Sequence, residues 1–239
     1  FNLGKFRGPD NSFIQIIKDY YLGFHRLSIN GLNQISNQPF IKSNIYLICN
    51  GEIYNHKKLK EEYSLFSQSD SDCEVILHKY DSEGVCMIED LDGDFAFCIM
   101  EEYSGHILAA RDPLGVNSMY YGVGVDGSIW FSSEAKPLVA EKCVDINVFP
   151  PGTFWSSKTQ EFFKYYRPKW TDYTFATQSY DKIALRKVVM DAVEKRLMSD
   201  VPYGVLLSGG LDSSLIASIV ARLKRYRFIQ FGDKKDLEK

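Results

Sequence analysis

The pattern of apolar and polar residues divides the chain into two parts of different character. Up to about residue 170, apolar residues come in short runs separated by turn residues, which is typical of antiparallel sheets. The run at 95–100 is apolar throughout and indicates a strand buried on both faces. Asp126 and Gly127 form a hairpin signal between two further runs. We predict a helix over 73–83 and strands at IYLICNG (45–51), FAFCIM (95–100), HILAAR (106–111), MYYGVGV (119–125) and SIWFSS (128–133).

Beyond residue 170 the pattern changes to that of helices. An amphipathic helix is predicted from about 181 to 198, with its apolar face formed by Leu185, Val188, Val189, Ala192, Val193 and Leu197. A strand, YGVLLS (203–208), and a glycine-rich loop follow. After them comes a second helix whose apolar face is formed by Ile216, Ile219, Val220 and Leu223. The order helix, strand, loop, helix is the opening of a doubly wound α/β domain.

These two patterns predict the domain organisation. We assign residues 1–170 to a first domain, the polar, aperiodic residues 171–179 to a linker, and residues 180–239 to the start of a second domain. The 239 residues are 45% hydrophobic, which is enough to bury one large core or two smaller ones.

Composition and charge exclude several classes of protein. No apolar run approaches the roughly 18 residues of a membrane helix, and the N-terminus lacks the apolar region of a secretory signal. The five cysteines form no CxxC pair, which favours free buried thiols in a reducing cytoplasm. Residues 171–239 hold 12 Lys and Arg against 9 Asp and Glu, a net charge of +3. A nucleic-acid-binding region would carry a larger excess of positive charge, whereas this modest excess suits a small anionic ligand.

The stretch SGGLDSS (208–214) lies between the predicted strand and the second helix, where anions bind in such sheets. Its glycines let the backbone approach a phosphate, and the helix N-terminus offers unpaired N–H groups. The carboxylate of Asp212 would suit a Mg²⁺ ion rather than the phosphate itself. The structural alternative is an ordinary turn in which Asp or Ser caps the helix. The stretch is neither a Walker A loop nor a G-x-G-x-x-G loop.

SGGLDSS resembles the pyrophosphate loop of the ATP pyrophosphatase family. Members of that family cleave ATP between the α and β phosphates and adenylate a carboxylate or carbonyl, which ammonia or a sulfur nucleophile then attacks. The resemblance implies ATP and Mg²⁺ as cofactors, with Mg²⁺ held by Asp212. It implies ATP or pyrophosphate contacts at Leu207, Ser208, Gly209, Gly210, Asp212, Ser213, Ser214 and Phe231.

The first part of the chain carries a second, ordered set of motifs. They are RGPD (7–10), HRLSIN (25–30), CNGEIYNH (49–56), SDCEV (71–75), LDGDFAF (91–97), ARDPLGV (110–116), YYG (120–122), FSSEAKPL (131–138) and PPG (150–152). In this order they resemble the class II glutamine amidotransferase domain, an α+β fold of the Ntn-hydrolase αββα sandwich type. Followed by SGGLDSS, they resemble the glutamine-dependent asparagine synthetase family.

The resemblance assigns roles in glutamine binding. The planar fork of Arg26 would hold the α-carboxylate of glutamine, and a surface ion pair is the alternative. The α-ammonium would be received by Glu52 and Asp72, although Asp72 also suits the N-cap of the helix that begins at 73. The same pocket would be lined by the backbone of Leu27, Ser28, Ile29 and Asn30.

The resemblance also assigns the groups that act on the amide. Asn50 and Gly51 would form an oxyanion hole, although Asn-Gly is also a good hairpin turn. The family nucleophile is a mature N-terminal cysteine that uses its own α-amine as the base. This chain begins with Phe1, and none of its five cysteines occupies the matching position. We therefore expect the given sequence to omit segments of the parent protein.

The expected activity is synthesis of asparagine from aspartate, glutamine and MgATP. Ammonia released by the first domain would pass internally to the second, where it displaces AMP from β-aspartyl-AMP. The expected partners are these small molecules and a second copy in a homodimer, with no nucleic acid and no membrane. One alternative is a β-lactam-synthetase-like enzyme, which closes a ring with ATP and lacks the cysteine. The other is a non-catalytic module that binds glutamine or nucleotide.

Overall fold

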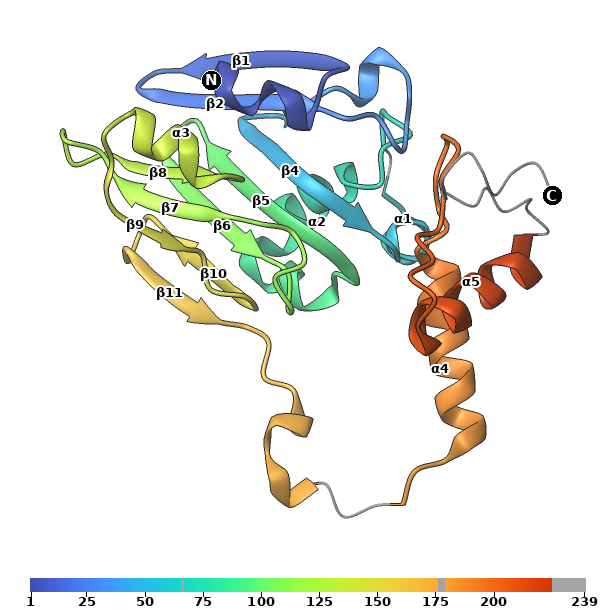
Figure 1. Cartoon of the computed structure of the whole chain (residues 1–239). Helices are drawn as coiled ribbons and strands as arrows, with labels where there is room; N and C mark the ends of the chain where they lie inside the picture. The colour runs from blue at the N-terminus through green and yellow to red at the C-terminus, as the bar shows by residue number, and fades with distance from the viewer. Residues whose placement is uncertain (66, 176–178, 225–239) are drawn as a thin grey trace. The chain divides into compact units, whose positions relative to one another are not determined.

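The computed structural model describes residues 1–65, 67–175 and 179–224. The chain forms two compact units, Phe1–Phe175 and Ala176–Lys239 (Figure 1). Among the described residues of the first unit the helices are α1 (His56–Glu62), α2 (Glu74–Glu83) and α3 (Ala135–Ala140), and those of the second are α4 (Lys182–Lys195) and α5 (Leu211–Lys224). Short 3-10 turns lie at Asn2–Arg7, Gln34–Ser36, Gly84–Asp90, Lys169–Thr171 and Tyr173–Phe175.

The first unit contains three antiparallel sheets. Their strands are β1 (Asn11–Ile17), β2 (Tyr20–Arg26), β3 (Phe40–Lys42), β4 (Ile45–Ile53), β5 (Gly93–Glu101), β6 (His106–Arg111), β7 (Tyr120–Val123), β8 (Ile129–Ser132), β9 (Val144–Val148), β10 (Thr153–Ser156) and β11 (Glu161–Lys164). Six strands form the largest sheet in the order β11-β10-β6-β5-β4-β3, while β8-β7-β9 and β1-β2 form the smaller ones.

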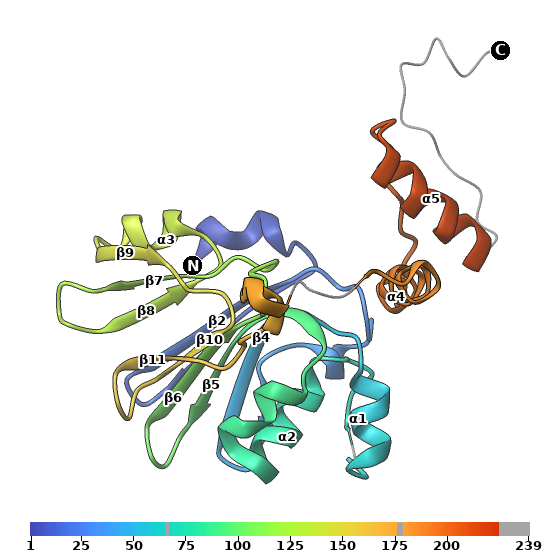
Figure 2. The same cartoon turned by 90° about the horizontal axis from the view of Figure 1, so that it is seen from below.

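The sheets and helices of this unit lie in layers (Figure 2). Helices α1 and α2 cover one face of the six-stranded sheet, and the two smaller sheets cover its other face, with α3 beyond β7, β8 and β9. The core between α2 and the large sheet contains Leu47, Ile53, Val75, Ile76, Phe95, Phe97 and Ile99. The core between the sheets contains Ala96, Ala109, Met119, Phe149 and Trp155. The first unit is therefore α+β, as predicted.

Most of the predicted elements of the first unit are confirmed. The strands at 45–51, 95–100 and 106–111 are β4, β5 and β6, and the helix over 73–83 is α2. The hairpin at Asp126 and Gly127 joins β7 to β8, and Gly127 has a φ of +82°. Its loop is longer than the predicted two residues, because the ladder ends at a hydrogen bond from Gly124 N to the Ser128 carbonyl (2.7 Å). The β1-β2 hairpin, strands β3, β9, β10 and β11, and helices α1 and α3 were not predicted.

In the second unit, the two predicted helices are present but the strand between them is not formed. The carboxylate of Asp181 caps α4 by accepting N–H groups from Ile183 (2.8 Å) and Ala184 (3.2 Å). Residues 202–208 have no regular secondary structure, and the side chain of Leu206 is 88% exposed. A strand is stable only beside a partner, and the described part of this unit contains no strand. The doubly wound fold thus remains a prediction.

No described helix combines the length and the apolar character that crossing a bilayer requires.

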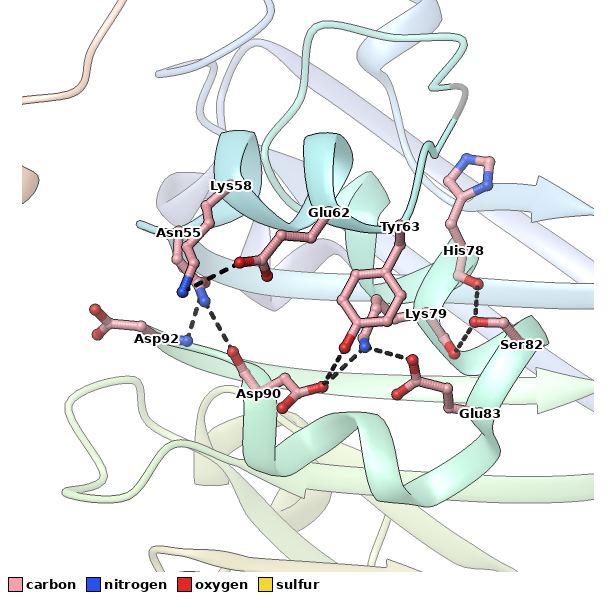
Figure 3. Close-up of polar contacts among 10 residues, drawn as sticks. All are labelled: Asn55, Lys58, Glu62, Tyr63, His78, Lys79, Ser82, Glu83, Asp90 and Asp92. Atoms are coloured by element: carbon pink, nitrogen blue, oxygen red, sulfur yellow. Dashed lines mark hydrogen bonds and ion pairs between the residues drawn. The ribbon is translucent and has the colours of Figure 1, made fainter.

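A buried lysine joins three segments on the helical side of the large sheet (Figure 3). Lys79 on α2 is fully buried, and its ammonium donates to the carboxylates of Glu83 (2.6 Å) and Asp90 (2.8 Å). It also lies 3.4 Å from the ring centroid of Tyr63. Burial opposes the charge, but the hydrogen bonds from Lys79 to Asp90 and Glu83 outweigh it and raise the pKa of Lys79. The network ties α2 to the turn Gly84–Asp90 and to the end of α1.

A buried carboxylate also holds the segment that enters α2. Glu74 accepts hydrogen bonds from the backbone N–H groups of Gln68 (2.9 Å) and Ser69 (2.8 Å), and contacts His78 (3.2 Å). Burial by itself would raise its pKa, but hydrogen bonds from His78, Ser69 and the backbone lower the pKa of Glu74 to about 2. The ionised carboxylate therefore stabilises the chain just before Asp72.

We expect Glu74→Gln to lower the free energy of unfolding at pH 7 by about 2–3 kcal/mol, because each pKa unit corresponds to about 1.36 kcal/mol. The pKa of Glu74 is lower in the folded state than its ordinary 4.5. Its contribution is thus complete above pH 4.5 and is lost as the pH falls toward 2. Urea unfolding measures the difference in free energy of unfolding between Glu74→Gln and the unsubstituted protein. This difference should be smaller at pH 3 than at pH 7. An equal difference at both values would contradict this, and Glu61→Gln, an exposed carboxyl on α1, is the matched control.

Candidate functional site

The first unit contains a cavity of about 770 Å³ that is open to solvent. Its walls come from β2, β4, β5, β8, α3 and the loops at 29–38, 71–73 and 116–119. Eight of the nine residues predicted to bind glutamine line it: Arg26, Leu27, Ile29, Asn30, Asn50, Gly51, Glu52 and Asp72. Ser28 does not line it, and its N–H donates to Oδ2 of Asp10 at 2.7 Å.

The alternation of side chains along β4 explains which of them face the cavity. Cys49 and Ile53 point into the core beneath α2, so Asn50 and Glu52 point to the opposite face. Asn50 is paired with Ala96 of β5, and both residues line the cavity. Because Asn50 and Gly51 lie inside a strand, the hairpin-turn alternative is wrong.

Gly51 is required by the closeness of the neighbouring strand. A Cβ at this position would lie 2.3 Å from the carbonyl oxygen of Asp94 and 2.7 Å from Cα of Phe95. Both contacts are to backbone, which cannot move aside as a flexible side chain does. The two strands therefore approach each other closely right beside Asn50.

The side-chain amide of Asn50 has an unused donor. Within the described part of the chain, Nδ2 is buried and has no hydrogen-bond partner. Leaving such a donor unpaired costs about 1–3 kcal/mol, so native proteins seldom keep one without a use. An oxygen atom of a ligand would satisfy it after a rotation of the amide, since Nδ2 is covered in this arrangement while Asn50 itself lines the cavity.

Arg26 at the end of β2 is buried, with 6% of its surface exposed, and organises the loop that follows it. Its Nη1 donates to the carbonyl of Asn33 (3.2 Å) and to Oδ1 of Asn37 (2.7 Å). Its Nη2 donates to the carbonyls of Asn30 (3.1 Å) and Gly31. The surface ion-pair alternative is therefore wrong. These bonds use all four N–H groups of Nη1 and Nη2, so a bidentate carboxylate would have to displace some of them.

Asp72 connects α2 to β4. Its Oδ2 accepts the backbone N–H of Ile53 at 2.7 Å, and its side chain is also hydrogen-bonded to that of Asn30. Burial raises the pKa of Asp72 against these hydrogen bonds. The capping alternative is wrong, because the N-cap residue of α2 is Cys73 and it makes no side-chain cap bond.

Three cysteines line the cavity: Cys49, Cys73 and Cys98. Burial raises the pKa of Cys98 to about 12. A hydrogen bond with Cys49, together with burial, raises the pKa of Cys73. Both groups are thus protonated thiols at neutral pH and poor nucleophiles. All five cysteines are free, as predicted, but Cys86 is exposed and Cys98 only half-buried.

Arg111 and Asp112, which were not predicted to have a role, hold the loop that forms another wall of the cavity. Arg111 donates three hydrogen bonds of 2.7 Å, to the carbonyls of Gly115, Asn117 and Phe149. The carboxylate of Asp112 accepts backbone N–H groups of Leu114, Val116 and Asn117, each at 3.0 Å. An Asp before Pro-x-Gly is a local signal for such a loop, whereas the contact with Phe149 comes from tertiary structure.

In the second unit, the predicted phosphate loop precedes α5. The hydroxyl oxygens of Ser208 and Ser213 lie 2.9 Å apart, and Ser213 donates to the carbonyl of Gly210 at 3.1 Å. Gly209 has a φ of +83°, with open space where a Cβ would stand. Leu207 and Asp212 are exposed, and Ser214 lies in the first turn of α5. Phe231 lies outside the described residues. The described residues contain no group of three or more His, Cys, Asp or Glu side chains suited to a metal ion.

Comparison with known proteins gives two family matches. Residues 3–162 match the glutamine amidotransferase domain family, and residues 184–233 match the asparagine synthase family. The matches occur in the order in which the two sets of motifs predicted them.

Curated relatives carry both regions. The chain is 46% identical over 227 residues to a probable glutamine-hydrolysing asparagine synthetase of Dictyostelium discoideum, covering 90% of this chain and 40% of that protein. It is 44% identical over 220 residues to glutamine-hydrolysing asparagine synthetase 1 of Arabidopsis thaliana, covering 90% and 37%. The chain thus spans about two fifths of the length of these relatives.

Among solved structures, the allosteric regulatory enzyme of purine biosynthesis matches with a TM-score of 0.54 and 20% identity, over 92% of this chain and 56% of that one. At this identity the match concerns the fold alone.

Proposed function

Because the chain belongs to the glutamine amidotransferase domain family over residues 3–162, we propose that its first unit, an Ntn-hydrolase-type αββα sandwich, binds glutamine in the cavity and promotes release of ammonia. The observation that carries this proposal is the buried, unpartnered Nδ2 of Asn50 in the cavity wall. Loss of ammonia from an amide passes through a tetrahedral oxyanion, which hydrogen-bond donors such as a side-chain amide stabilise.

The chemistry proceeds through a thioester. A cysteine thiolate attacks the amide carbon of glutamine, and the carbonyl oxygen becomes an oxyanion that accepts hydrogen bonds from Nδ2 of Asn50 and the N–H of Gly51. The C–N bond breaks as the nitrogen takes up the proton that the α-amine of the nucleophile received from its thiol, so that ammonia leaves, and water then hydrolyses the thioester to glutamate and regenerates the thiol. The nucleophile that the family resemblance implies is a mature N-terminal cysteine, and none of the five cysteines of residues 1–239 is assigned this role. The raised pKa values of Cys73 and Cys98 support this exclusion.

The ends of the glutamine molecule are recognised by charge. The α-ammonium lies toward Glu52 and Asp72, and the α-carboxylate lies toward Arg26 and the backbone of Leu27, Ile29 and Asn30, while Ser28 lies outside the cavity. Arg26 acts chiefly by holding the loop that begins at Asn30, since its Nη1 and Nη2 donors already bind that loop. The α-carboxylate of glutamine can then accept a single remaining N–H of Arg26, or interact with the positive charge of its guanidinium without a hydrogen bond.

For the second unit we propose the start of a doubly wound ATP pyrophosphatase domain, within a chain organised as 1–170, linker 171–179 and 180–239. The pyrophosphate of ATP binds at Ser208–Gly210 and Asp212–Ser214, with Leu207 and Phe231 also contacting ATP. The exposed serine hydroxyls and the open Gly209 support this placement. Asp212 supplies one Mg²⁺ contact, which suits an ion whose remaining ligands are phosphates and water.

For the complete protein we propose asparagine synthesis. ATP activates the side-chain carboxylate of aspartate as β-aspartyl-AMP, and ammonia that travels inside the protein displaces AMP. The match of residues 184–233 to the asparagine synthase family and the names of the relatives support this reaction. Free cysteines suit a cytoplasmic location. A homodimer rests on family resemblance alone.

The test supplies the complete native protein with glutamine labelled with ¹⁵N in its side-chain amide, together with aspartate and MgATP. We expect one labelled asparagine per AMP and pyrophosphate, and no AMP when aspartate is omitted. Binding of glutamine without turnover would favour the non-catalytic module. Pyrophosphate release with a carboxyethyl-arginine-type substrate, but not with aspartate, would favour the β-lactam-synthetase-like enzyme.

A further inference from the structure

The edge of β4 loses its strand partner just before Asn50. Strand β3 pairs with β4 from Lys42, opposite Ile45, to Phe40, opposite Leu47. Continued pairing would place residue 38 opposite Cys49. The residue between, Pro39, has no N–H to extend the ladder, and β3 begins only at Phe40. The N–H and C=O of Cys49 on this edge must therefore find other partners.

The side chain of Gln38 provides both partners. Its Oε1 accepts the backbone N–H of Cys49 at 2.6 Å, and its Nε2 donates to the carbonyl of Cys49 at 2.9 Å. Gln38 is 8% exposed and lines the cavity. A primary amide carries a donor and an acceptor side by side, as a peptide group does, so it can replace a strand at one position.

Gln38 is itself anchored. The preceding residue, Asn37, accepts a hydrogen bond from Arg26 at 2.7 Å. The loop of residues 30–37 is held at three further points by the same guanidinium. A continuous set of contacts thus runs from Arg26 through Gln38 to the backbone of Cys49, next to Asn50.

We propose that Gln38 is a positioning residue for glutamine hydrolysis. By holding both backbone groups of Cys49, it fixes the place from which Nδ2 of Asn50 and the N–H of Gly51 reach the oxyanion. Gln38 acts through these donors and touches no reacting atom. The inference rests on the proposed function and extends it to a residue outside the predicted site.

The test measures glutamine hydrolysis by the complete native protein with Gln38→Met, which keeps the size of the side chain and removes both hydrogen bonds. Misplacing catalytic groups by about 1 Å can cost about 100-fold, so we expect kcat to fall by about 10- to 100-fold. KM for glutamine should change less than about threefold, because the ends of the substrate are held elsewhere. The kcat of Gln38→Glu, which keeps the acceptor for the N–H of Cys49, should lie between that of Gln38→Met and that of the unsubstituted protein.

A double-mutant cycle separates positioning from a general structural role. If Gln38 acts through Asn50 and Gly51, Gln38→Met should slow the Asn50→Ala protein by clearly less than it slows the unsubstituted protein, because only the N–H of Gly51 is then left to misplace. An unchanged kcat for Gln38→Met, or a full additional loss in the double variant, would overturn the inference while glutamine hydrolysis itself stands. If Gln38→Met does not fold, Gln38→Glu takes its place in the same cycle. If the unsubstituted protein releases no glutamate, the proposed function and the inference both fall.

Discussion

Replacing Asn50 with alanine is expected to slow glutamine hydrolysis by about 10²- to 10³-fold, because removing one oxyanion donor costs about 3–4 kcal/mol of transition-state stabilisation. The donor has no partner in the described part of the chain, so the substitution breaks no hydrogen bond in the resting protein. KM for glutamine should therefore change little. Steady-state kinetics of glutamate release by the complete native protein, with kcat and KM obtained separately, provide the measurement.

Two controls make this result interpretable. Asn50→Asp keeps the shape of the side chain but replaces the donor with a carboxylate, so we expect a loss at least as large. Ammonia supplied in place of glutamine should support asparagine formation by both variants at the unsubstituted rate, since the cavity of the first unit is then bypassed. A rise in KM with kcat unchanged would show that Asn50 binds the ground state and is not an oxyanion donor.

The second large effect concerns stability and the network of Lys79. Glu83→Gln combined with Asp90→Asn should lower the free energy of unfolding by about 3–5 kcal/mol, because it leaves a buried ammonium without a counter-charge. The side chain of Lys79 is 0% exposed, whereas those of Glu83 and Asp90 are 29% and 44% exposed. Water can reach the carboxylates but not the ammonium, so the loss of the carboxylates is the more damaging change. Denaturant unfolding followed by circular dichroism measures it.

The matched variants use this asymmetry. Lys79→Met keeps the apolar stem and leaves two partly hydrated carboxylates, so it should cost less than about 2 kcal/mol. Added to the double carboxylate variant, Lys79→Met should restore most of the lost stability. If the triple variant is no more stable than the double variant, the buried charge is not the cause of the loss.

Local pattern along the chain determined much of the first unit. The apolar run at 45–51 predicted a strand, which the structure extends to Ile53, so that Asn50 and Glu52 share a face of it. The continuous run at 95–100 specified its buried partner. The order of the motifs alone indicated a glutamine site, and the cavity contains eight of the nine residues assigned to it.

Tertiary structure decided which partners these residues have. Asp72 is adjacent to a helix start, yet its carboxylate binds Ile53 of β4, from which 19 positions separate it. Arg26 suits a carboxylate by its chemistry, yet its fork binds loop carbonyls that only the fold brings near. Gln38 lies outside every motif and gains its place because β3 begins only two residues later in the chain, at Phe40.

The strand predicted at 203–208 is not formed for the same physical reason. Its apolar pattern is suitable, but a strand is completed by hydrogen bonds to a neighbour that the pattern cannot supply. Periodicity is a property of the chain itself and can be recognised in the sequence alone. By contrast, the fold decides which hydrogen-bond partners a residue has, how deeply it is buried and in which direction the side-chain amide of Asn50 points. These depend on residues distant in sequence, which only the folded structure brings together.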